Sequence, residues 1–161
     1  MAWTTTRTRA ALENVVSIVE GTTPDNTWAG TKRFKHIDRA QLDSVRTARD
    51  ASRLFVVDLV GDRVLAGDML TTREPGTVEQ TVELQIVYPL SDSPWDLARI
   101  IAEDVDRLAF RLMLASLYDQ ANTGIWRRRV DGYSIDEPDQ QGGVATVTVP
   151  VALQYRPNFS G

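Results

Sequence analysis

The chain has 161 residues, 42% of them hydrophobic and 25% charged, which is typical of one globular domain that buries roughly 70% of its unfolded surface. It contains no cysteine, which excludes disulfides and thiolate metal sites and favours cytosolic synthesis. The net charge of −4 comes from the middle of the chain, because residues 51–120 carry 12 acidic and 6 basic side chains. This argues against a dedicated nucleic-acid-binding protein, which normally has a basic face. No run of about 18 apolar residues occurs, so we expect no membrane-spanning segment.

The first third predicts a helix followed by a long insertion. Apolar residues at helical spacing predict a helix over residues 5–20, which Gly21 can close in the left-handed conformation. Residues 21–52 are polar and rich in turn-forming residues, so we expect an insertion that does not build the core. Within it, residues 33–37 are a possible short strand, and residues 38–52 a loop or short helical turn.

The next segment predicts two strands joined by a tight turn. Residues 54–60 are β-branched and aromatic, which favours a strand. Gly61-Asp62 fits a type II′ turn into a second strand at residues 63–70, and Pro75-Gly76 marks a loop at residues 71–76. The expected result is a hairpin followed by a second loop.

Alternating patterns predict three further strands. Residues 78–88 alternate apolar and polar side chains, so one face should meet the core and the other water or a partner. Residues 125–136 and 144–155 alternate in the same way. Pro150 cannot donate to a ladder, which places the last strand at an edge or a bulge there.

A long helix between these strands is the strongest single signal. Ser93 can cap it, Pro94 suits its first position, and an apolar stripe continues to Leu117. Phe110, Met113 and Leu114 widen the apolar surface, so a flank of the helix is available to a second partner. The elements together predict an α+β fold for residues 1–161: an antiparallel or mixed sheet of about four to six strands, covered on one face by two helices, with protruding hairpins and loops.

Few residues point to chemistry. His36, the single histidine, has no nucleophile nearby in sequence, so we interpret it as a surface residue. Glu103, Asp104 and Asp106 could chelate magnesium, but a solvated helix face paired with Arg99, Arg107 and Arg111 explains them better. Gly30-Thr31-Lys32 has the wrong order for a phosphate loop. We therefore expect no enzyme and no cofactor.

Arginines and exposed aromatic residues are better candidates for an interface. Arg127 and Arg129 should share one side of their strand, either paired with acids such as Glu79 and Glu83 or contacting another subunit or a phosphate. Trp3 and Trp28 lie among polar residues and are candidate anchors. The hairpin of residues 61–76 does not build the expected core and is a further candidate interface. The predicted interface residues are Trp28, Asp62, Arg63, Asp68, Arg73, Glu74, Arg127 and Arg129.

The order of these elements resembles a known family. An amphipathic helix precedes a hairpin, then a strand ending in Val-Tyr-Pro-Leu at residues 87–90 leads into a helix that starts Pro-Trp-Asp at residues 94–96. Gly-Ile-Trp-Arg-Arg-Arg-Val at residues 124–130 and the alternating strand of residues 144–156 follow. Over most of residues 5–157, this resembles the tail terminator (tail completion) proteins of long-tailed, lambda-like bacteriophages.

The resemblance implies a structural virion protein without a cofactor. Such proteins form a hexameric ring that caps the tail tube, ends tube polymerisation and joins the tail to a head–tail connector or stopper protein. DNA passes through the ring without specific binding, and the expected location is the head-proximal end of the virion tail after assembly in the host cytoplasm. The alternatives are a head–tail connector (neck) or tail-tube protein of the same virion, a small-molecule or nucleotide-processing enzyme, and a protein-binding adaptor.

Overall fold

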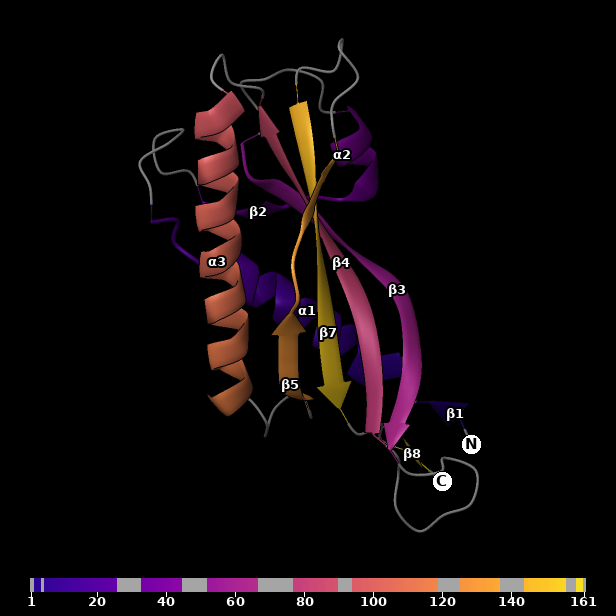
Figure 1. The fold of residues 1–161 in the computed structure, drawn as a ribbon. Helices are drawn as coiled ribbons and strands as arrows, with labels where there is room; N and C mark the ends of the chain where they lie inside the picture. Colours follow the sequence, from indigo (N-terminus) through magenta and orange to yellow (C-terminus); the bar gives the residue numbers. More distant parts are fainter. Residues whose placement is uncertain are drawn as a thin grey trace.

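The computed structural model describes residues 2–3, 5–25, 33–44, 52–66, 77–89, 94–118, 125–136, 144–155 and 159–160. These residues form an α+β fold with a mixed six-stranded sheet (Figure 1), as the sequence predicts. The helices are α1 (Thr5–Glu20), α2 (Arg39–Ser44) and α3 (Pro94–Tyr118). The strands are β1 (Ala2–Trp3), β2 (Lys35–His36), β3 (Leu54–Ala66), β4 (Thr77–Pro89), β5 (Ile125–Val130), β6 (Ser134–Asp136), β7 (Val144–Tyr155) and β8 (Phe159–Ser160).

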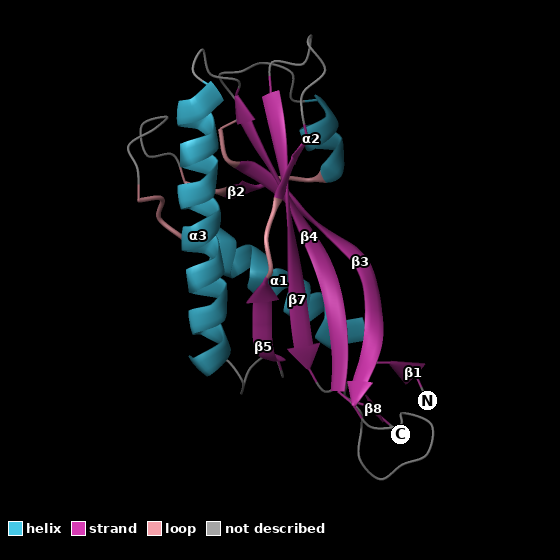
Figure 2. Cartoon of the chain, in the orientation of Figure 1, coloured by secondary structure: helices cyan, strands magenta, loops and turns pink. Residues whose placement is uncertain are grey.

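The sheet is built around two long central strands. Its order is β2-β3-β4-β7-β5, and β6 also pairs with β7. Only β2 and β3 are parallel, while the other neighbours are antiparallel (Figure 2). Because β4 accompanies β7 from Val144 to Tyr155, β5 and β6 both lie along the other side of β7. Separately, β1 pairs with β8 and joins the two ends of the chain.

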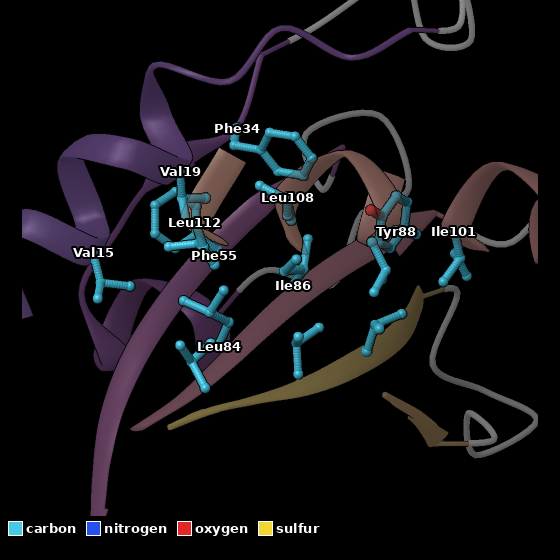
Figure 3. Close-up of a cluster of buried hydrophobic side chains, with 14 of the residues drawn as sticks. Val15, Val19, Phe34, Phe55, Leu84, Ile86, Tyr88, Ile101, Leu108 and Leu112 are labelled. Carbon is cyan, nitrogen blue, oxygen red and sulfur yellow. The ribbon is translucent and has the colours of Figure 1, made fainter. Parts of the chain in front are cut away.

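Helices α1 and α3 cover one face of this sheet. The predicted apolar stripe of α3 is buried, including Leu108 and Leu112, and it packs with Val15 and Val19 of α1 (Figure 3). The sheet contributes alternate residues of β4 and β7, whose period of two places every second side chain on one face. These residues are Val82, Leu84, Ile86, Tyr88, Ala145, Val147, Val149, Val151 and Leu153.

The C-terminus of helix α1 is capped by the Thr22 side chain and not by a left-handed glycine. The Gly21 N–H donates to Ser17 O at 2.9 Å, and the Thr22 hydroxyl donates to Ile18 O at 2.8 Å. Gly21 does not have the positive φ that we predicted. The buried threonine side chain satisfies a terminal carbonyl, which is the task that a left-handed glycine often performs.

Strand β3 is continuous where the sequence predicted a turn. Gly61 lies opposite Thr81 and Asp62 opposite Gln80, so the Gly61-Asp62 turn and the separate strand at residues 63–70 are wrong. The register shifts between Leu59 and Gly61, which marks a bulge. Val60 is the residue without a partner in this bulge, and the pairing with β4 continues on both sides of it. Residues 67–76, which include the loop predicted at residues 71–76, lie outside the described part.

The insertion of residues 21–52 contributes to the core, contrary to our expectation. Phe34 is buried in the same apolar cluster as α1 and α3, and Ile37 is also buried. Strand β2 attaches to the start of β3, since the Ile37 N–H donates to Phe55 O at 3.0 Å. The predicted short strand is therefore confirmed, but as a structural part of the domain.

Helix α2 confirms the short helical turn and lies toward the opposite face of the sheet. Asp38 accepts a hydrogen bond from the Gln41 N–H at 2.7 Å, and Gln41 accepts one from the Asp38 N–H at 3.1 Å. This reciprocal capping box explains why so polar a segment starts a helix there. Arg39 then pairs with Asp58 and donates to Gln85 at 2.7 Å, two side chains that alternate with the core residues.

Pro150 lies where β7 has a strand partner on one side only. It pairs with Glu83 of β4, whereas β5 reaches only Val151 and β6 begins opposite Thr148. The strand that we predicted over residues 125–136 is broken here at residues 131–133, and Gly132 has φ 153°. A missing N–H costs nothing at such a local edge, so the prediction for Pro150 is confirmed.

If the insertion builds the core, Phe34→Ala should lower the free energy of unfolding by about 3–5 kcal/mol, because it empties a buried aromatic site. Urea denaturation monitored by circular dichroism measures this. Lys35→Ala changes the exposed neighbouring residue and serves as the control, with an expected change within about 0.5 kcal/mol. Equal, small effects of both substitutions would contradict the assignment.

Candidate functional site

Arg129 lies in an ion-paired cluster on the outer sheet face, the face opposite α1 and α3. Its Nε donates to Asp131 Oδ2 at 2.8 Å, and its Nη1 is 3.9 Å from Glu79 Oε2. The hydrogen bond and negative charge of Asp131 raise the pKa of Arg129 above its usual value, so the guanidinium remains charged. The predicted cross-strand pairing with Glu79 is confirmed, and an intersubunit role for Arg129 stays a prediction.

The strand register aligns further predicted interface residues in one row. Arg63 of β3 lies opposite Glu79 of β4, Glu79 opposite Gln154 of β7, and Gln154 opposite Arg127 of β5. Gln154 donates to the Glu79 carboxylate at 3.1 Å. The row therefore places the backbone positions of two arginines on either side of one buried acid, and opposite charges across strands stabilise such pairs.

The side chains of the other predicted interface residues lie outside the described part of the structure. Asp62 belongs to β3, opposite Gln80, but its side chain lies outside the described part of the structure. The side chains of Arg63 and Arg127 do so as well. Residues Trp28, Asp68, Arg73 and Glu74 fall wholly outside the described residues.

The main surprise is a buried ionic cluster formed by Arg53, Asp104 and Tyr88. Arg53 Nε donates to Asp104 Oδ2 at 2.7 Å and Nη2 to Oδ1 at 3.2 Å, which is a bidentate pair. The Tyr88 hydroxyl donates to Asp104 Oδ2 at 2.8 Å. All three side chains are buried, and the Arg53 guanidinium also lies 5.8 Å from the centre of the Phe34 ring.

The backbone of Arg53 is fixed as firmly as its side chain. Its φ of 58° is left-handed, which disfavours a residue with a Cβ. Its N–H donates to Val87 O at 2.9 Å, and its carbonyl accepts from the Lys35 N–H at 3.0 Å. Arg53 thus links β4, the insertion and α3 at the start of β3.

Our interpretation of Asp104 as part of a solvated acidic face is wrong. Asp104 lies three residues after Ile101 and four before Leu108, both buried, so helical spacing puts it on the core face of α3. That spacing was the signal in the sequence. Its partner Arg53 had no such signal, because nothing in the local pattern marks a left-handed, buried arginine.

The remaining acids of α3 do face solvent, as predicted. Glu103 pairs with Arg99 at 3.2 Å, and Arg107 lies 3.6 Å from Asp25, beyond the end of α1. Asp25, Glu103, Asp106, Arg107 and Phe110 line an open hollow of about 400 Å³. Phe110 and Met113 are exposed, which confirms that this flank of α3 is not buried against its own sheet in the described structure.

Of the remaining chemical candidates, the structure describes His36 but not Gly30-Thr31-Lys32. His36 is exposed, and its ring lies 5.4 Å from Phe55 at a tilt of 57°. Its backbone N–H donates to Glu20 Oε1 at 3.0 Å. Across the part of the chain that the structure describes, no three His, Cys, Asp or Glu side chains are grouped to hold a metal ion. The same part contains no helix with the length and apolar character that crossing a membrane requires.

Comparison of the sequence with models of known protein families finds no match, and comparison with curated proteins finds none either.

Removing one charge of the buried Arg53–Asp104 pair should lower the free energy of unfolding more than removing both charges. Asp104→Asn leaves a buried guanidinium without its counter-charge, so we expect the free energy of unfolding to fall by about 3–5 kcal/mol. The double variant Arg53→Met with Asp104→Leu removes both charges and should lose less than the single variant. Urea denaturation of both measures this, and a double variant less stable than Asp104→Asn would contradict it.

The cluster also predicts a loss of stability in alkali. Burial first, and then the charge and hydrogen bond of Asp104, raise the pKa of Tyr88 well above its usual 10.0. Above that pH the unfolded tyrosine releases its proton while the folded one keeps it, so the free energy of unfolding falls as pH rises. Unfolding measured between neutral pH and strong alkali should show this slope.

Tyr88→Phe should remove that part of the slope and cost about 1–3 kcal/mol at neutral pH, because Asp104 loses a donor. Tyr133→Phe alters an exposed tyrosine and should keep the wild-type slope. An alkaline slope of Tyr88→Phe equal to that of the wild type would count against the assignment.

Proposed function

We propose that this protein is a tail terminator: a structural virion protein that caps the tail tube as a ring, ends tube polymerisation and joins the tail to a head–tail connector. The observation that carries the proposal is the order of the elements. The long helix α1, the strands β3 and β4, the long helix α3 and the final strands β5 and β7 follow one another in nearly the order on which the resemblance rests, with the one difference that β4 is the second strand of the hairpin and not a separate element after it. The proposed role needs no catalysis and no cofactor.

The outer sheet face supports this role, because α1 and α3 do not cover it, although α2 contacts it near Asp58 and Gln85. Thr81 and Glu83 of β4 and Thr148 of β7 are only partly buried there, and Pro150 is exposed. Partly buried polar rows of this kind suit an assembly contact that forms after folding, since non-obligate interfaces are about as polar as ordinary surface.

The charges of the same face support the passage of DNA without specific binding. Arg129 is already engaged by Asp131 and Glu79, and Arg39 by Asp58. Tight nonspecific binding to DNA requires lysines or arginines that neutralise phosphates. Arginines held by the chain's own carboxylates are poorly placed to do so, and we propose that DNA slides past this protein for that reason.

The test is the assembly state of the purified protein. We expect one closed species of six times the monomer mass by native mass spectrometry, and rings in electron micrographs, because cyclic assembly stops when its heterologous contacts close. Long tubes would instead assign the protein to the tail-tube class. A strict monomer, both alone and with tail tubes, would refute the proposal.

A further inference from the structure

The edge of β3 is the longest strand edge in the described structure that lacks a neighbouring strand. β2 pairs with β3 only at Leu54 and Phe55, and no described strand accompanies Val56–Ala66 on that side. We call this stretch the β3 edge. Leu59 and Val60 lie in it and are 52% and 55% exposed. Natural proteins usually protect such an apolar edge, because it offers a template for another strand.

The backbone of the β3 edge has a defined direction for pairing. The carbonyl of Phe55 accepts from Ile37 on the β2 side, so its backbone groups point away from β4. Since these groups alternate along an antiparallel strand, Val57 and Leu59 also direct their N–H and C=O groups to that side. An incoming strand would therefore meet the backbone N–H donors and C=O acceptors of Val57 and Leu59, together with the exposed Leu59 side chain.

The opposite edge of the sheet also ends in a strand with exposed apolar side chains. β6 lies along the side of β7 away from β4, and its three residues are exposed. We call residues Tyr133–Asp136 the β6 edge. Tyr133 and Ile135 in it are 40% and 39% exposed. β5, the other strand on this side, instead packs against α3.

The strand directions at the two edges are complementary. β3 and β7 run the same way, because each is antiparallel to β4, and β6 runs opposite to both. Continuing the sheet into a second copy would therefore bring β3 beside β6 in the antiparallel arrangement. This contact joins two different surfaces, which is the condition for a ring rather than a closed dimer.

From this geometry we infer that the β3 edge of one copy pairs with the β6 edge of the next by strand addition, with Leu59 and Val60 packing near Tyr133 and Ile135. The main-chain bonds would supply affinity and the apolar side chains the register. The inference deepens the proposed function and rests on it, because it names the contact that would close the ring.

The test uses one blocked edge at a time. Leu59→Lys places a charge on the β3 edge, and Ile135→Lys places one on the β6 edge; a charged edge resists strand addition. Phe110→Lys alters an equally exposed apolar residue, 56% exposed, on α3 and serves as the matched control. Val60→Lys is a second β3-edge variant. Circular dichroism and thermal unfolding check that each variant folds.

We expect each edge variant to lose self-association at least about tenfold by sedimentation velocity, while Phe110→Lys assembles as the wild type does. A one-to-one mixture of Leu59→Lys and Ile135→Lys should form a heterodimer, because each variant carries the edge that the other lacks. This recovery also shows that both variants are folded.

Other outcomes overturn the inference in distinguishable ways. Normal rings from Leu59→Lys and Ile135→Lys would refute the edge contact and leave the terminator proposal intact. Dimers from Ile135→Lys alone would show that two β3 edges pair with each other. Open tubes that Leu59→Lys abolishes would support the edge contact but refute the terminator role. A wild-type protein that stays monomeric alone and with tail tubes would refute both.

Discussion

The buried pair of Arg53 and Asp104 is the constraint on which the arrangement of this domain depends. Transferring two charges from water to a protein interior costs several kcal/mol each, and only close geometry with further hydrogen bonds offsets it. Here the bidentate pair and the Tyr88 hydroxyl supply that geometry. The three residues come from the start of β3, the middle of α3 and the end of β4. A slide of α3 by one turn would move Asp104 about 5.4 Å and leave Arg53 buried and unmatched. The pair therefore penalises alternative positions of α3 that an apolar stripe alone would tolerate.

The same residue explains how the insertion became part of the core. Arg53 meets the Phe34 ring with its guanidinium and the Lys35 N–H with its carbonyl. The polar composition of residues 21–52 suggested a loop outside the core, because such patterns report average burial. A single aromatic residue such as Phe34 can be buried without changing that average. The burial of Phe34 depends on tertiary contacts, which the local sequence pattern does not contain.

Periodicity predicted the parts of the fold that depend on local burial. The apolar stripe of α3 and the alternation of β4 and β7 were sufficient to place most of the core. The failures lie where a residue type permits two structures: Gly61 fits a turn and also a bulge, and the full-length partner β4 decided in favour of the bulge. Asp104 was assigned to solvent from its charge, although its spacing placed it among buried residues. Of the predicted interface, only the pairing of Arg129 with Glu79 could be inferred from sequence, because cross-strand pairing follows from alternation and charge.

The edges of the sheet connect this fold to assembly. A sheet with β4 and β7 at its centre buries one face under α1 and α3, but among the described residues no strand pairs with Val56–Ala66 on the outer side of β3 or with the outer side of β6. The short strand β2 pairs only with the start of β3, and the apolar side chains of Leu59 and Val60, at the bulge, are exposed. The edge strands β3 and β6 run in opposite directions. The two edges are therefore different surfaces, and β3 of one copy could pair with β6 of another in the antiparallel arrangement. A self-complementary edge would favour a closed pair, whereas two different edges favour continuation, and curvature from sheet twist then decides between a ring and an open filament. The strand order of the fold is thus compatible with the contact that the proposed cap, built from identical copies, would require.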